Sequence, residues 1–143
     1  MRRIAALPCL LIVAGCSPLS EEKDEFRAAV LRWNEADLHS YSYTFQYGCF
    51  CPRAGVYAIV VRDDTVESAE VIEGGWDEEQ QPYALTVPQM FQLIREALDE
   101  DPDDATLRFA ELGYPISVGF DRWEDAVDDE WGMGVEDFVA LTP

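Results

Sequence analysis

The pattern of apolar and polar positions along the chain changes repeatedly between the period of a helix and that of a strand. Apolar residues recur every three or four positions in residues 20–37 and 86–98, which predicts two amphipathic helices. Residues 41–51 alternate instead, with Tyr, Phe and Cys side chains on one face, which predicts a half-buried strand. Shorter apolar runs predict five more strands, at residues 56–61, 66–72, 107–109, 116–120 and 135–141.

Local signals at the ends of these segments support their assignment as helices and strands. Ser20 precedes two glutamates and is expected to cap the first helix. Thr86 and Gln89 have the spacing of a capping box at the start of the second helix. Asp63 and Asp64 predict a tight turn between two of the strands.

The predicted elements follow the order αβββαβββ. One antiparallel β-sheet with two main helices on one of its faces is the natural packing for this order, so the sequence predicts an α+β fold. A single domain over residues 21–143 accounts for all of these elements. The repeated pattern of one helix and three strands also suggests an internal duplication.

The N-terminus has the features of a secretory signal peptide. A basic start is followed by an apolar run and by the small residues Ala14 and Gly15, directly before Cys16. This arrangement is typical of a bacterial lipoprotein, in which the leader, residues 1–15, is removed and the thiol of Cys16 carries the lipid. The apolar run is much shorter than the roughly 20 residues of a membrane span. Residues 16–20 are then the lipidated cysteine and a short tether.

Such a leader predicts a protein of the cell envelope, held at a membrane by its lipid anchor. Ser17 stands where a retention signal usually has Asp, so in a host with two membranes we expect the outer membrane, facing the periplasm. The formal net charge of −19 excludes nucleic acid as a partner. The acidic surface is either an ordinary solvated surface or a docking face for a basic envelope protein or for cations.

The four cysteines are expected to have different fates. Cys9 leaves with the leader and Cys16 carries the lipid, so Cys49 and Cys51 remain, and we expect these two to form a disulfide in the oxidising envelope. Residues two apart in a regular strand have Cα atoms roughly 6.6 Å apart, near the upper limit for a disulfide. The backbone is therefore expected to bend at Phe50. The alternative is a pair of buried, reduced thiols.

The sequence offers no complete catalytic or metal-binding set. His39 is the single histidine, and no Gly-x-Ser-x-Gly elbow accompanies it, so we expect no catalytic residue. A zinc site needs three or four ligands, and the soft candidates are limited to His39, Cys49 and Cys51. We therefore expect neither a metal site nor a cofactor.

Several short motifs resemble a known family. Tyr-Ser-Tyr-Thr-Phe at residues 41–45 is followed by Cys49-Phe50-Cys51, and Leu-Gly-Tyr-Pro occupies residues 112–115. These motifs and their order are similar to a family of bacterial lipoproteins known as domain-of-unknown-function 6174. The resemblance spans nearly all of the expected domain and implies the same architecture. It implies no activity, because none is assigned to the family.

These observations favour a non-enzymatic, lipid-anchored envelope protein that binds or scaffolds another envelope component. The first alternative is a thiol-disulfide or metal-handling protein that uses Cys49 and Cys51. The second alternative is an inhibitor of a secreted enzyme, which the apparent duplication suggests by analogy.

Overall fold

The computed structural model describes residues 18–74, 81–123, 126 and 128–142, and it has the predicted α+β fold in a single domain. The order of the elements is αβββαβββ, as predicted. Neither described helix is both long and apolar enough to cross a membrane. The elements are α1 (Pro18–Ala36), β1 (Tyr41–Cys49), β2 (Gly55–Arg62), β3 (Thr65–Gly74), α2 (Val87–Asp99), β4 (Asp104–Phe109), β5 (Pro115–Asp121) and β6 (Trp131–Ala140).

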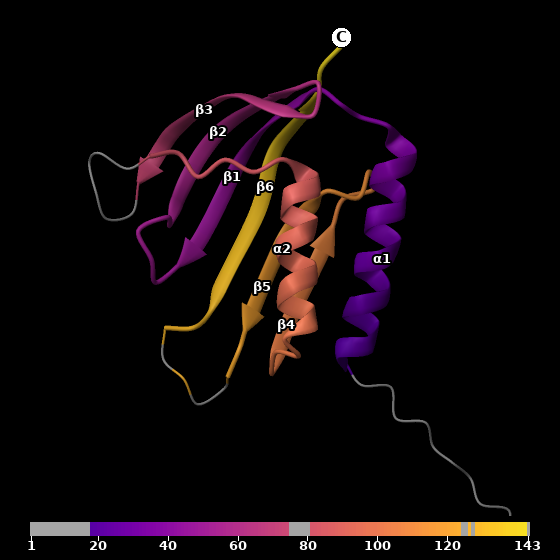
Figure 1. Ribbon diagram of the computed structural model, residues 1–143, viewed down its shortest axis with the longest axis vertical. Helices are drawn as coiled ribbons and strands as arrows, with labels where there is room; N and C mark the ends of the chain where they lie inside the picture. Colours follow the sequence, from indigo (N-terminus) through magenta and orange to yellow (C-terminus); the bar gives the residue numbers. More distant parts are fainter. Residues whose placement is uncertain (1–17, 75–80, 124–125, 127, 143) are drawn as a thin grey trace, which may run out of the picture.

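The six strands form one antiparallel sheet whose spatial order is β3-β2-β1-β6-β5-β4. Both helices lie on the same face of this sheet (Figure 1). Helix α2 belongs to the connection that carries the chain from edge strand β3 to the opposite edge strand, β4. The two helices are neighbours on this face and together line one groove, although about seventy residues of sequence separate corresponding parts of them.

The core lies between the helices and the covered face of the sheet. Strand β1 shows the predicted alternation, with Tyr41, Tyr43 and Phe45 buried. Phe26 of α1 meets Phe91 of α2 edge to face, with ring centroids 6.0 Å apart. Full burial of one such aromatic side chain contributes about 1.5–3 kcal/mol, so the contact between the helices is a substantial part of the core.

Helix α2 is attached to the central strand through its N-terminus. The predicted capping box is present: the backbone N–H of Gln89 donates to the hydroxyl of Thr86, and the Gln89 side chain accepts from the Thr86 N–H. The N–H of Val87 donates to the Tyr41 hydroxyl at 3.1 Å. The Tyr43 hydroxyl donates to the carbonyl of Leu85. The three bonds made by the N–H groups of Thr86, Val87 and Gln89 satisfy donors that a helix start leaves without partners.

The start of α1 differs from the prediction. The helix begins at Pro18, so Ser20 lies inside its first turn and is not the N-cap.

The start of β6 also differs, because the strand begins at Trp131, four residues before the predicted position. The predicted strand left out residues 131–134, which include Gly132 and Gly134. A Cβ at Gly132 would lie 2.8 Å from the carbonyl oxygen of Val118, and one at Gly134 would lie 2.6 Å from that of Ile116. The glycines thus permit β6 to approach β5 closely.

The topology does not support an internal duplication. Strands β4–β6 keep the lateral order of β1–β3, but each runs opposite to its counterpart, since β1 and β6 are antiparallel neighbours. A rotation that matched the two sets of strands would place their helices on opposite faces of the sheet. Both helices cover one face (Figure 1), so the repeat in the sequence pattern is not a repeat of structure.

Candidate binding groove

A groove of about 430 Å³ runs between the two helices on the outer side of the molecule. This volume is within the usual range for sites that take small molecules. We call it the α1–α2 groove. Its lining residues are Lys23, Phe26, Arg27, Val30 and Leu31 of α1 and Arg95, Leu98 and Asp99 of α2.

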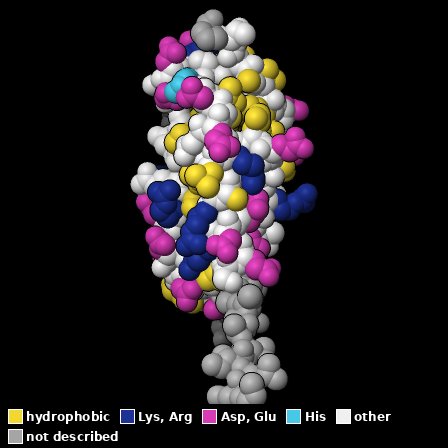
Figure 2. All heavy atoms as spheres, turned by 90° about the vertical axis from the view of Figure 1, so that its right-hand side faces the viewer, with side chains coloured by type: hydrophobic (Ala, Val, Ile, Leu, Met, Phe, Trp, Pro, Cys, Tyr) yellow, Lys and Arg dark blue, Asp and Glu magenta, His cyan; other side chains and the backbone are white. Residues whose placement is uncertain are grey.

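Basic side chains gather at this groove. Eight Lys and Arg residues follow the expected leader, and three of them, Lys23, Arg27 and Arg95, line the groove. Figure 2 shows dark-blue side chains grouped with yellow ones on the face that α1 presents. For a chain with a net charge of −19, this is a local departure from the general acidity.

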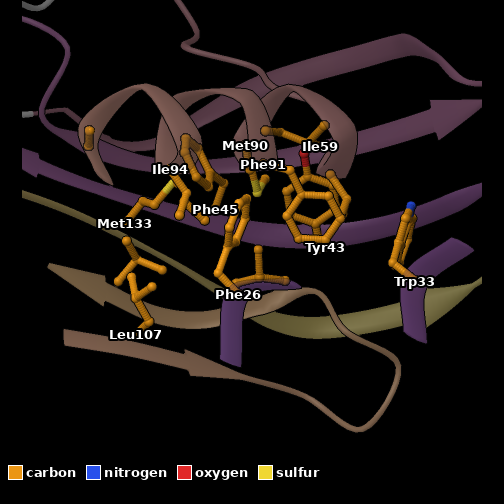
Figure 3. Packing of buried hydrophobic residues seen from close by; sticks show 14 of the residues in the cluster. Phe26, Trp33, Tyr43, Phe45, Ile59, Met90, Phe91, Ile94, Leu107 and Met133 are labelled. Carbon is orange, nitrogen blue, oxygen red and sulfur yellow. The ribbon is translucent and has the colours of Figure 1, made fainter. Parts of the chain in front are cut away.

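The floor of the groove is apolar. Phe26 and Leu98 are buried, and Figure 3 shows Phe26 reaching from α1 toward the side chains below α2. Leu31 stands on the α1 side with 62% of its surface exposed. Lys23 and Arg27 are four residues apart and so share one face of α1, where their aliphatic stems extend the apolar wall. The groove therefore combines an apolar floor with a charged rim.

The three cations of the rim differ in their partners. Arg27 Nη1 lies 2.7 Å from Asp24 Oδ1, and Lys23 Nζ lies 3.9 Å from an oxygen of Asp101. Among the described residues, no carboxylate forms an ion pair with Arg95. Its guanidinium carbon lies 5.9 Å from the centroid of the Phe26 ring, a cation–π distance. Arg95 is thus the rim cation best placed to pair with an anion in the groove.

The two cysteines that the sequence pairs are adjacent in space. The structure joins Cys49 and Cys51 in a disulfide, with Cα atoms 5.2 Å apart. Strand β1 ends at Cys49 rather than at Cys51 as predicted, and the chain turns at Phe50, which is 65% exposed. The bend brings the Cα atoms closer than a regular strand would allow. Cys16, the predicted lipidation site, lies outside the described residues.

His39 lies at the other end of β1 from the cysteines, so the three soft candidate ligands do not meet. The length of this strand places His39 roughly 25 Å from Cys49. His39 instead contacts two carboxylates: its Nδ1 is 2.7 Å from Asp64 and its Nε2 is 3.3 Å from Asp37. The hydrogen bond with Asp64, then the charges of Asp64 and Asp37, raise the pKa of His39. Within the described ranges, no three His, Cys, Asp or Glu residues converge on a metal position.

Sequence reasoning did not identify the α1–α2 groove. Lys23 and Arg27 have the spacing of one helix face, and Leu31 continues that face, which was a usable signal. The contribution of Arg95 could not be read in the same way, because it depends on which helices become neighbours.

The structure defines a single-domain α+β protein in which two adjacent helices on one face of an antiparallel sheet enclose a groove. The chain belongs to the family of unknown function DUF6174, whose model matches residues 25–140. No curated protein and no solved structure shows significant similarity to it.

Proposed function

We propose that this chain is a lipid-tethered protein of the cell envelope that binds another envelope component in the α1–α2 groove and catalyses no reaction. The groove, with its apolar floor and its concentration of cations, is the observation that carries the proposal. Ligand sites are typically concave and mostly apolar, with a few polar groups that orient the ligand. The leader that ends at Cys16 supports the envelope location.

The expected anchor lies close to the groove along the chain. Helix α1 begins at Pro18, two residues after Cys16, and the groove begins at Lys23. Five helical residues span about 7.5 Å, so a lipid on Cys16 would hold the groove near the membrane surface. A component of that surface, or of a protein beside it, would therefore be within reach.

A photo-crosslinking amino acid at Leu31 tests the proposal in intact cells. Ile72 on edge strand β3 is the matched control, because it is 60% exposed against 62% for Leu31 and lies outside the groove. We expect a discrete adduct from the Leu31 position and none from the Ile72 position. Equal labelling at both positions, or none at either, would contradict binding in the groove.

A variant in which both Cys49 and Cys51 are replaced by serine distinguishes the groove proposal from the thiol-disulfide alternative. Because neither cysteine lines the groove, the proposal expects the Leu31 adduct to form unchanged in this variant. Loss of the adduct with an unchanged circular dichroism spectrum would favour the alternative. The enzyme-inhibitor alternative was suggested by the apparent duplication, and the topology removes that reason for it.

A further inference from the structure

We infer that the α1–α2 groove takes a single-chain amphiphile with an anionic head, a free fatty acid, whose carboxylate pairs with Arg95. The inference rests on the proposed function and specifies the component that the groove binds. Two features of the groove carry it: an apolar floor beside a charged rim in which three cations face one lining carboxylate, Asp99, and the difference between Arg95 and the other rim cations.

The floor suits a hydrocarbon chain. Phe26 and Leu98 close the bottom of the groove and are 6% and 3% exposed, so its accessible carbon surface comes mainly from the half-buried Val30 and the exposed Leu31. A chain in this position removes its methylenes from water. Association of that kind strengthens with chain length, by about fourfold for each buried methylene.

The rim selects the sign of the head group. Arg27 is already paired with Asp24, and Lys23 lies near Asp101. Arg95 has the Phe26 ring as its partner, and a guanidinium can stack on a ring while its N–H groups bind a carboxylate in the plane. The Arg95 guanidinium is therefore held over the Phe26 ring of the apolar floor, and the head of a bound chain would lie beside it. A cationic head would be repelled at the same place.

The size of the groove favours one chain over a diacyl phospholipid. The volume of about 430 Å³ is near the lower end of the range for ligand sites. Charge complementarity to Arg95 further selects a carboxylate over an uncharged alcohol or ester of the same length.

Photoaffinity labelling of the mature, lipidated protein in phosphatidylcholine vesicles tests the inference. The probe is a dodecanoic acid that carries a diazirine, and the labelled peptide is identified by mass spectrometry. We expect labelling of α1 or α2 residues of the groove, with dodecanoate competing about tenfold or more better than dodecyltrimethylammonium. Decanoate should compete about fifteenfold less well than dodecanoate, because it has two fewer methylenes and each contributes about fourfold.

Two variants with matched controls connect this labelling to the groove. Arg95→Gln should abolish the preference for dodecanoate over dodecyltrimethylammonium, while Arg62→Gln, a change on β2 outside the groove, should preserve it. Leu31→Gln should weaken labelling several-fold, while Ile72→Gln should not. Both leucine and isoleucine are largely exposed, so neither change threatens the fold.

The outcomes distinguish failure of this inference from failure of the proposed function. Equal competition by the two amphiphiles, or labelling that is unaffected by both groove variants, would overturn the fatty-acid assignment. If dodecanoate does not protect the groove while the Leu31 crosslink still captures a protein, the groove binds a protein segment, and only this inference is wrong. If the Leu31 crosslink also fails, the proposed function is wrong as well.

Discussion

The side chain of His39 lies between two carboxylates, and its protonated form is the one that the fold favours. The hydrogen bond with Asp64 is the largest cause of the raised pKa, followed by the charges of Asp64 and Asp37. Because the folded-state pKa is raised above the unfolded value of about 6.5, the resulting stabilisation is fully present below that value. It is lost as the pH rises through the folded-state pKa.

Asp64→Asn should lower the pKa of His39 and reduce the stability of the fold more at pH 5.5 than at pH 9. Asn tolerates the positive φ of 64° at this turn position, so the change removes the charge and preserves the turn. The chain has a single histidine, so one imidazole signal in an NMR titration reports its pKa directly. Urea unfolding at the two pH values measures the stability. An equal loss of stability at both pH values would show that the Asp64 carboxylate stabilises the turn and not the charged form of His39.

The turn between β4 and β5 is built against the backbone of α1 at Gly113. This residue has a φ of +98°, and its N–H donates to the carbonyl of Ala110 at 2.9 Å. A Cβ at this position would collide with the carbonyl oxygen of Ala29 and lie 2.8 Å from the backbone nitrogen of Trp33. The close approach between a turn and a helix requires glycine here.

Gly113→Ala should therefore lower the free energy of unfolding by about 2 kcal/mol or more, through backbone strain and the contact with α1. Gly119→Ala in β5 is the control, because a Cβ there would meet nothing within 4 Å. We expect that change to lie within about 0.5 kcal/mol of the wild type. Chemical denaturation of both variants provides the measurement, and equal losses would contradict the assigned role of Gly113.

The elements that the sequence predicted well are those whose signal is local. The alternation in β1, the capping box at Thr86 and the turn at Asp63 and Asp64 each depend on residues within a few positions of one another. Two of the differences from the prediction have a non-local cause. The early start of β6 depends on the approach of β5 to two glycines, and the groove depends on the neighbouring positions of α1 and α2. Hydrophobic period does not contain that information.

At the scale of the whole molecule, the proposed anchor decides where the groove can act. Cys16→Ala should leave an unprocessed precursor and remove the mature form from the detergent-extractable membrane fraction. Cys9→Ala, which changes the cysteine inside the leader, should be processed and anchored as in the wild type. Incorporation of labelled fatty acid, followed by gel analysis, measures lipidation and processing in both variants. A wild-type protein that incorporates no label would refute the lipid anchor.

The order of the strands also sets when the protein can fold. The central pair of the sheet joins β1 to β6, and Tyr41 is aligned with Ala140. The two halves of the sheet therefore join only when β6, the last of the six strands to be synthesised, is available. Pairings between such distant segments make folding slow, because the entropy cost of closing a long loop must be met before the contacts that offset it can form. A nascent chain that has reached only β3 or α2 lacks the middle of its sheet. For the export that we propose, this delay would be useful, since a chain that remains unfolded during synthesis can still be threaded through a translocation channel.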